Sequence, residues 1–396
     1  MFPTDVVIVA GARTPMARYT GSFSEVSAID LAAHASKAAI QRSGVDPKEF
    51  DHAIFGNVMQ TSADAIYGAR HVGLKAGLRI ETPAVTVNRL CGSGIEAISQ
   101  AAQRLLLGEA EMVLAGGMEN MTQAPFVIRG ARTGLKLGGG ALEDFLFVGL
   151  TDTYCAMPMA VTAETLAAQT GITRKGADAY ALRSQQAADA AAKAGYYREE
   201  IVPVEVKQGR KTIVVSEDDH RRPETTMETL EKLAPSFQKD GIVTAGNASG
   251  IVDGAAAVVV TREKSAKARG LKPIGRIVSW ATAGVDPRIM GIGPVPSTRK
   301  ALELAGLRLE QIDRVEVNEA FAAQYLAVEK ELGLQRDKTN VNGGAIALGH
   351  PLGASGTRLV ITVLNELRRK GLRYGLATAC IGGGQGIAMI LEALGN

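Results

Sequence analysis

An apolar, strand-like run meets a cysteine, two glycines and a helical pattern in the stretch Thr86-Val87-Asn88-Arg89-Leu90-Cys91-Gly92-Ser93-Gly94-Ile95-Glu96-Ala97. The pattern predicts a strand over 83–90 and a helix over 94–107, which places Cys91 at the N-terminus of a helix. Unpaired backbone N–H groups and the helix dipole favour the thiolate at such a position, and the thiolate is the form of cysteine that attacks carbonyl carbons. We therefore expect Cys91 to be a nucleophile.

Two other interpretations of this turn have to be weighed. A cysteine at a helix start can be a small buried hydrophobe, but Gly92 and Gly94, which follow Cys91 closely, favour close approach of a substrate. The spacing Gly92-x-Gly94-x-x-Ala97 also matches the dinucleotide-binding fingerprint. That pattern is short and recurs by chance, and nothing else in residues 1–117 clearly supplies the acidic residue that would bind a ribose.

The chain carries an internal duplication. Further strands are predicted over 6–10, 53–56 and 112–115, and their alternation with helices favours a mostly parallel sheet covered by helices. The segment Ala39–Asn57 aligns without gaps on Ala301–Glu319, with a helix, a glycine, a polar turn and a strand in the same order. The sequence therefore predicts two similar α/β halves.

The two halves differ by one long insertion. In the second half, the strands predicted over 376–380 and 387–391 form a plain hairpin. In the first half the corresponding strands are 112–115 and 256–261, so the segment between them is inserted. We predict an N-terminal half made of 1–117 plus 249–272, an inserted loop domain of 118–248 over the mouth between the halves, and a C-terminal half of 273–396.

The duplication relates the turn that carries Cys91 to a second turn, which carries His350. His350 lies in a glycine-rich stretch, 342–356, that precedes a helix as Cys91 does, so pseudo-twofold symmetry would bring His350 and Cys91 to one seam. Cys380 ends the strand before Gly382-Gly383-Gly384 and is expected at the same seam. Asn318, at the end of a duplicated strand, is a candidate polar residue for orienting the others.

Composition excludes several classes of protein. The 396 residues are 46% hydrophobic and 21% charged, and no apolar run reaches the roughly 20 residues that span a bilayer. The net charge of +3 comes from scattered residues, which argues against a nucleic-acid-binding surface. Residues 1–5 lead directly into an apolar strand and leave no room for a signal peptide, and three cysteines suit a reducing compartment. We expect a cytoplasmic protein.

The motifs at these positions resemble those of thiolases, and the resemblance covers essentially the whole chain. The matching stretches are Asn88–Gly94, Gly116–Met121, Gly246–Gly250, Asn318–Ala322, Gly343–Gly356 and Cys380–Gly384. The resemblance implies the five-layered αβαβα thiolase fold, with two duplicated α/β halves and an inserted loop domain. It also implies reversible, CoA-dependent cleavage of 3-ketoacyl-CoA to acetyl-CoA and a shortened acyl-CoA.

The roles of the site residues are also those that the resemblance implies. Cys91 would become acylated, and His350 would take its proton or activate the thiol of CoA. Cys380 would move a proton to or from the α carbon of the acetyl group. One oxyanion would be held by His350 and a water on Asn318, and the other by the backbone N–H groups of Cys91 and Gly382.

The resemblance further places the substrate in the loop domain. Ser249 would lie near the pantetheine of CoA and Arg222 near its adenine and phosphate end, and Ala248, Met159 and Phe321 are expected in the substrate site. Acyl-CoA and CoA are substrates, and no cofactor and no metal are implied. A homo-oligomer is expected, either a dimer or a tetramer.

One departure bears on the substrate. Biosynthetic acetoacetyl-CoA thiolases carry a histidine in the stretch that corresponds to Ala156–Ala160, where this chain has none. The chain therefore looks more like degradative 3-ketoacyl-CoA thiolases of broader chain length. The alternatives are a biosynthetic enzyme restricted to short chains, a decarboxylating ketoacyl synthase, and a thiolase-like protein that binds acyl-CoA without turnover.

Overall fold

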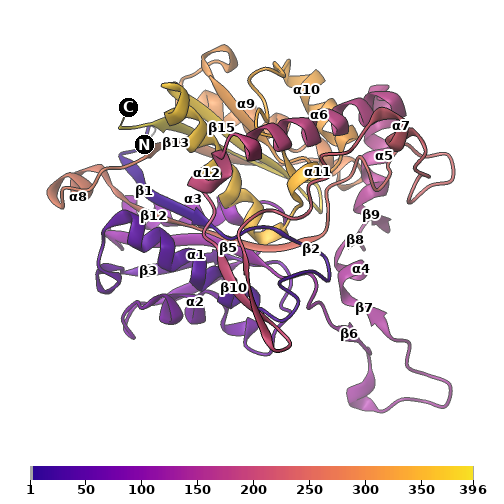
Figure 1. Ribbon diagram of the computed structural model, residues 1–396, viewed down its shortest axis with the longest axis horizontal. Helices are drawn as coiled ribbons and strands as arrows, with labels where there is room; N and C mark the ends of the chain where they lie inside the picture. The colour runs from indigo at the N-terminus through magenta and orange to yellow at the C-terminus, as the bar shows by residue number, and fades with distance from the viewer. Residues whose placement is uncertain (1–2, 396) are drawn as a thin grey trace.

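Two half-sheets with the same strand order meet edge to edge in the structure, a computed structural model that describes residues 3–395 (Figure 1). The N-terminal half-sheet consists, in spatial order, of β4 (Ala84–Val87), β3 (His52–Gly56), β5 (Met112–Glu119), β12 (Val252–Arg262) and β1 (Val6–Arg13). The C-terminal half-sheet continues with β13 (Gly275–Gly284), β16 (Gln385–Ala393), β15 (Tyr374–Ile381) and β14 (Arg314–Val317). A short strand, β2 (Ala17–Arg18), pairs with β12.

The strand order confirms the duplication. Thr339 pairs in parallel with Val315 of β14, in the place that β4 takes beside β3. Between the halves, β1 and β13 share only the pairs Val7↔Arg276 and Ile8↔Gly275. The chain therefore contains two copies of one α/β unit, joined along a short edge.

The prediction of a mostly parallel sheet is wrong. Among the pairs of named strands along the described sheet, β3–β4, β3–β5 and β14–β15 are parallel, and the others are antiparallel. The reason lies in the connections, because the turn Gly382–Gly384 joins β15 directly to β16 without a crossover helix. Each half is therefore a mixed sheet.

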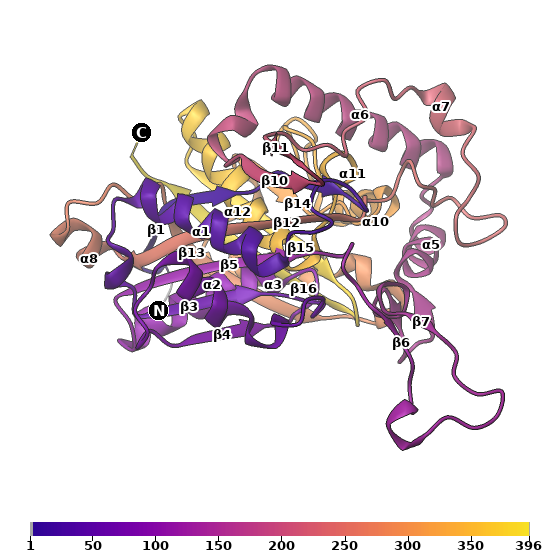
Figure 2. The same ribbon diagram turned by 60° about the horizontal axis from the view of Figure 1, so that its bottom comes forward.

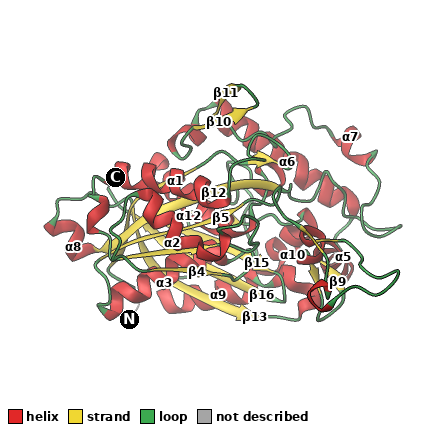
Figure 3. Ribbon diagram, turned by 90° about the horizontal axis from the view of Figure 1, so that it is seen from below, coloured by secondary structure: helices red, strands yellow, loops and turns green. Residues whose placement is uncertain are grey.

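Helices form three layers around the two half-sheets (Figures 2 and 3). The central helices α3 (Ser93–Leu107) and α12 (Leu352–Lys370) share one core with strands of both halves. The outer face of the N-terminal half is covered by α1 (Ala28–Ser43) and α2 (Gly68–Ala76). The outer face of the C-terminal half is covered by α9 (Pro294–Ala305) and α10 (Ala322–Leu332). These are the five layers that the family resemblance implies.

The backbones of the two central helices approach each other closely near their N-terminal ends. A Cβ atom added to Gly94 would lie 2.5 Å from the backbone nitrogen of Thr357. A Cβ atom added to Gly356 would lie 2.5 Å from the backbone nitrogen of Ile95. Only glycine allows this approach, which brings the N-terminal ends of α3 and α12 together.

The long insertion separates two strands that pair directly. β5 and β12 are antiparallel neighbours, as the duplication predicts, and residues 120–251 lie between them in the sequence. This segment contains α5 (Met159–Thr170), α6 (Arg174–Lys193), α7 (Met227–Glu231), and the hairpin of β10 (Val204–Gln208) and β11 (Lys211–Val215). It also contains β6 (Phe126–Val127), β7 (Glu143–Asp144), α4 (Phe145–Gly149), β8 (Thr151–Asp152) and β9 (Met157–Pro158). The part between β6 and β7 projects from the body as an arm (Figures 1 and 2).

Two short helices complete the described chain, α8 (Glu263–Ala268) after β12 and α11 (Ala345–Leu348) before α12. Within residues 3–395, no helix combines the length and the apolar character needed to cross a membrane.

Candidate active site

The turn that carries Cys91 is held by its own side chains. Leu90 has a φ of 45°, a left-handed conformation that is strained for a branched residue. The Asn88 side chain accepts a hydrogen bond from the Leu90 N–H at 2.9 Å. The Ser93 hydroxyl accepts from the Arg89 N–H at 2.8 Å and donates to the Leu90 carbonyl at 2.7 Å. These local bonds fix Cys91 between the end of β4 and the start of α3.

The resting state of Cys91 differs from the sequence-based expectation. The thiol is partly open to the cavities described below, yet the surrounding protein raises its pKa to about 11, mainly by burial. Backbone N–H groups of Gly382 and of Cys91 itself lower this pKa, and the charge of Glu119 raises it. Burial outweighs the backbone N–H groups, so Cys91 rests as a thiol and needs a base to become a nucleophile.

His350 lies between α11 and α12 and is buried, with 5% of its surface exposed. Its backbone N–H donates to the Gly250 carbonyl at 2.9 Å. The ring nitrogen Nε2 lies 3.2 Å from the Asn318 Nδ2, and Nδ1 lies 2.5 Å from the Ser355 hydroxyl. Burial, followed by the charge of Arg358, lowers the pKa of His350 to about 3. The imidazole is therefore neutral and able to accept a proton.

Cys380 is fully buried near the end of β15 and packs against Met290 and Ala320. Burial, followed by the charge of Cys91, raises the pKa of the Cys380 thiol well above its usual value. The next turn begins at Gly382, whose backbone N–H faces the Cys91 sulfur. The duplication thus brings both thiols and the imidazole to one place, as the sequence predicts.

Asn318 follows β14 and is fully buried. The neighbouring segment is attached to the insertion through main-chain hydrogen bonds. The Ser249 N–H donates to the Ala320 carbonyl at 3.0 Å, and the Ala322 N–H donates to the Asn247 carbonyl at 2.8 Å. Two stretches far apart in the sequence therefore form one wall of the site.

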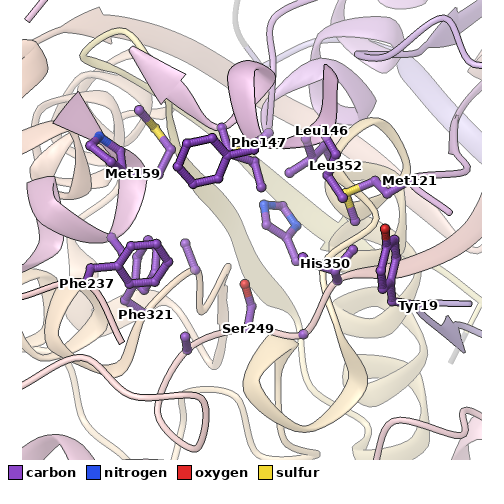
Figure 4. A pocket seen from close by; sticks show the side chains of 18 of the residues that line it. Tyr19, Met121, Leu146, Phe147, Met159, Phe237, Ser249, Phe321, His350 and Leu352 are labelled. Atoms are coloured by element: carbon purple, nitrogen blue, oxygen red, sulfur yellow. The ribbon is translucent and has the colours of Figure 1, made fainter. Parts of the chain in front are cut away.

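A cavity of about 370 Å³ opens onto this wall (Figure 4). His350 stands among the side chains that line it, and the Ser249 hydroxyl points into it. Most of the lining side chains are apolar, which suits a ligand with an extended, weakly polar chain. Six of the residues predicted for the site line the cavity: Cys91, His350, Met159, Ala248, Ser249 and Phe321.

A second cavity, of about 230 Å³, meets the first at Cys91. Cys91 and Met159 line both cavities, and Gly382 lines the second one. The residues 151–153, from β8 and the turn after it, form its polar side. A group attached to the Cys91 sulfur therefore has space on two sides.

The remaining predicted residues lie outside the lining of the first cavity. Asn318 and Cys380 are buried behind it, where they contact His350 and the wall residues Met290 and Ala320. Arg222 is exposed, and its backbone N–H donates to the Gln185 side chain at 2.9 Å. The cavity therefore lies against the predicted catalytic residues, whereas Arg222, which is expected to contact the phosphate end of CoA, lies outside it.

Sequence reasoning did not single out several residues of the site. The first cavity is also lined by Tyr19, Phe147 and Phe237. These residues come from separate segments, and no motif links them in the sequence. Leu352 also lines the cavity and Ser355 contacts His350, and both had an available signal, because they lie two and five residues after His350 in the same glycine-rich stretch.

A nucleophilic sulfur, a neutral imidazole and a second thiol around an apolar cavity suit acyl transfer. Comparisons with known proteins agree. The model described as "Thiolase, N-terminal domain" matches residues 6–264, and "Thiolase, C-terminal domain" matches 271–393. The chain is 54% identical to the mitochondrial 3-ketoacyl-CoA thiolase of Homo sapiens, over 98% of both chains. It is 50% identical to an acetyl-CoA acetyltransferase of Escherichia coli (strain K12), over 98% of this chain and 99% of the relative.

Solved structures give the same result. The crystal structure of human mitochondrial 3-ketoacyl-CoA thiolase in complex with CoA superposes with a TM-score of 0.95 and 53% identity, over 98% of both chains. The acetyl-CoA acetyltransferase of Bacillus anthracis superposes with a TM-score of 0.97 and 44% identity, over 99% of this chain and all of that one. With both family models matched and these full-length likenesses, the chain belongs to the thiolase family.

Proposed function

We propose that this protein is a 3-ketoacyl-CoA thiolase, which cleaves 3-ketoacyl-CoA with CoA to acetyl-CoA and a shortened acyl-CoA and also catalyses the reverse condensation. The observation that carries the proposal is the position of Cys91, at the junction of two cavities, the first of which is also lined by the neutral imidazole of His350. Its likeness to 3-ketoacyl-CoA thiolases over nearly the whole chain supports the same activity. Such an enzyme would serve the β-oxidation of fatty acids.

The first half-reaction forms an acyl-enzyme. His350 takes the Cys91 proton, the sulfur attacks the 3-keto carbon, and the bond between the keto carbon and the α carbon breaks. The electron pair of that bond passes to the α carbon, which Cys380 protonates to give acetyl-CoA. The proton on His350 then passes to the Cys380 thiolate, which leaves the imidazole neutral again. CoA enters, His350 takes the proton of its thiol, and the CoA sulfur forms its bond to the acyl carbon. Cys91 leaves as a thiolate and takes that proton back from His350.

Developing negative charge on the thioester oxygens needs hydrogen-bond donors. We assign one oxyanion hole to His350 together with a water held by Asn318, and the other to the backbone N–H groups of Cys91 and Gly382. The contact between the Asn318 amide and His350, and the Gly382 N–H that faces the Cys91 sulfur, support this assignment.

CoA would occupy the first cavity as a substrate. Ser249, Ala248, Met159 and Phe321 line it and would contact the pantetheine and thioester, while exposed Arg222 would meet the adenine and phosphate end outside it. The division into 1–117 plus 249–272, 118–248 and 273–396 stays a proposal. The antiparallel pairing of β5 and β12 supports it, because the intervening residues leave the half-sheet and return to it.

The acyl-enzyme is the direct test. After mixing with acetyl-CoA, mass spectrometry of the Cys91 peptide should show an added acetyl group, and an unmodified peptide would contradict the mechanism. Cys380→Ser should still be acetylated at Cys91 but lose both thiolysis and condensation. A Cys380→Ser variant with normal turnover would remove Cys380 from the proton-transfer role. A protein that binds acyl-CoA without turnover would show neither result.

We propose a degradative enzyme that accepts chains longer than acetoacetyl-CoA. The stretch Ala156–Ala160, which corresponds to the one that carries a histidine in biosynthetic thiolases, has none, and the second cavity beside Cys91 offers space for a longer acyl chain. Thiolysis rates should be measured over a series of 3-ketoacyl chain lengths. Activity with acetoacetyl-CoA alone would favour the short-chain biosynthetic alternative.

We also propose a homo-oligomer, a dimer or a tetramer, in the cytoplasm. The arm between β6 and β7 exposes large apolar side chains that another copy of the chain could bury: Phe126, Ile128, Leu135, Leu137 and Leu142. The three free cysteines agree with a reducing compartment. Sedimentation velocity of Leu137→Asp should show a smaller particle than the parent, whereas the control Leu107→Asp, at an exposed leucine of α3, should not.

A further inference from the structure

Ser355 closes a chain of hydrogen bonds that starts at the imidazole of His350. The Ser355 hydroxyl lies 2.5 Å from His350 Nδ1 and 2.9 Å from the Pro351 carbonyl oxygen. The Pro351 carbonyl oxygen can only accept, so in this contact the donor is the Ser355 hydroxyl, and we assign its single proton to the bond with Pro351. The serine oxygen then accepts a proton from its other partner, which places a hydrogen on Nδ1 of His350.

The other ring nitrogen has the complementary environment. Asn318 Nδ2 is a donor and lies 3.2 Å from His350 Nε2, so Nε2 accepts in this arrangement. The ring is neutral and carries one proton, which the first contact already assigns to Nδ1. Nε2 therefore carries the lone pair.

We propose that Ser355 is a positioning residue that fixes His350 in the tautomer protonated at Nδ1 and leaves Nε2 free to take a proton. This inference rests on the proposed function, in which His350 is the base. In the acylation step the Cys91 proton moves to Nε2, the sulfur forms its bond to the carbonyl carbon, and Nε2–H can then donate to the new oxyanion. The opposite tautomer could not accept that proton at Nε2.

Ser355 is built for this task. It is 1% exposed and lies in the first turn of α12, so it is rigidly placed against His350. The chain contains a matched serine without the imidazole contact. Ser297 is also fully buried in the first turn of a helix, α9, and its hydroxyl donates to the Gly293 carbonyl, four residues earlier, at 3.0 Å. Ser297 makes the same helical contact, and its hydroxyl does not touch a histidine.

The tautomer can be measured in the unmodified protein. The chain has five histidines, so solid-state ¹⁵N NMR of protein labelled only in histidine rings gives few signals, and His350→Asn identifies those of His350. We expect a protonated Nδ1 and an unprotonated Nε2. An Nε2 that carries the proton would overturn the inference, whether or not the protein turns out to be a thiolase.

Variants then test the role of the serine. Ser355→Ala should give mixed His350 tautomers and lower kcat by roughly 10- to 100-fold with little change in KM, because a general base contributes about 10²- to 10⁴-fold. Ser297→Ala should change neither. Ser355→Thr, which keeps the hydroxyl, should restore the parent tautomer. Parent-like kcat and ¹⁵N signals in Ser355→Ala would overturn the inference, whereas absence of Cys91 acylation in the parent would contradict the proposed function instead.

Discussion

The close contact between α3 and α12 makes Gly94→Ala the most informative single substitution. The added Cβ atom would lie 2.5 Å from the Thr357 backbone nitrogen, whereas ordinary contacts begin near 3.4 Å. The two helices must therefore separate by up to about 0.9 Å. Overpacking costs about 1–3 kcal/mol, and the upper end applies because backbone atoms cannot rotate away. The higher helix propensity of alanine offsets about 1 kcal/mol of this cost, so the free energy of unfolding should fall by about 2 kcal/mol in total.

The same separation should affect catalysis. Cys91 lies two residues before α3 and His350 two residues before α12, so moving the helices apart should move the sulfur away from the base. A displacement of about 1 Å can cost roughly 100-fold in rate, and we expect a kcat reduced by about that factor. The assay is the thiolysis rate together with urea unfolding followed by circular dichroism.

A matched glycine gives the opposite prediction. In Gly73→Ala, in α2, the added Cβ atom would lie 3.4 Å from the Leu78 side chain, which is ordinary contact. Only the propensity gain remains, so this variant should be more stable by roughly 0.5–1 kcal/mol and keep its activity. If Gly94→Ala instead shifts the urea midpoint as Gly73→Ala does and keeps its kcat, the backbone contact between the central helices does not determine the site geometry.

Three further predictions concern ionisable groups. Because the pKa of Cys91 is raised to about 11, its rate of alkylation by iodoacetamide should keep rising from pH 7 to 10, and a plateau below pH 9 would indicate a resting thiolate. The pKa of His350 is lowered to about 3 in the folded state, so its contribution to the free energy of unfolding is complete above pH 6.5 and is lost as the pH falls toward 3. In His350→Asn, the free energy of urea unfolding should therefore fall less between pH 6.5 and pH 3 than in the parent protein. Arg13→Met leaves the buried carboxylates of Glu200 and Asp218 without their ion-pair partner, and should lower the free energy of urea unfolding by about 3–5 kcal/mol. Arg262→Met, at a partly exposed ion pair, should cost at most about 1 kcal/mol, and equal losses would contradict the burial argument.

The order of strands, turns and helices along the chain could be predicted from the sequence, because hydrophobic periodicity and glycine-containing turns are local properties. The helix predicted over 94–107 is α3, Ser93–Leu107, and the duplication correctly related the turns of Cys91 and His350. Strand direction was not readable, since it depends on how the connections cross the sheet rather than on the strands themselves. The mostly parallel sheet was therefore predicted wrongly.

The sequence by itself determined which residue types meet at the seam: two thiols, one imidazole and one amide, carried by two copies of one α/β unit. Only the tertiary structure decided their chemical state. Cys91 lies at a helix start that favours the thiolate locally, but burial by distant segments raises its pKa to about 11. The hydrogen bond of His350 to Asn318 likewise depends on how the end of β14 packs against the start of α12. Desolvation and hydrogen bonding act through space, so they are fixed only when segments far apart in the chain come together.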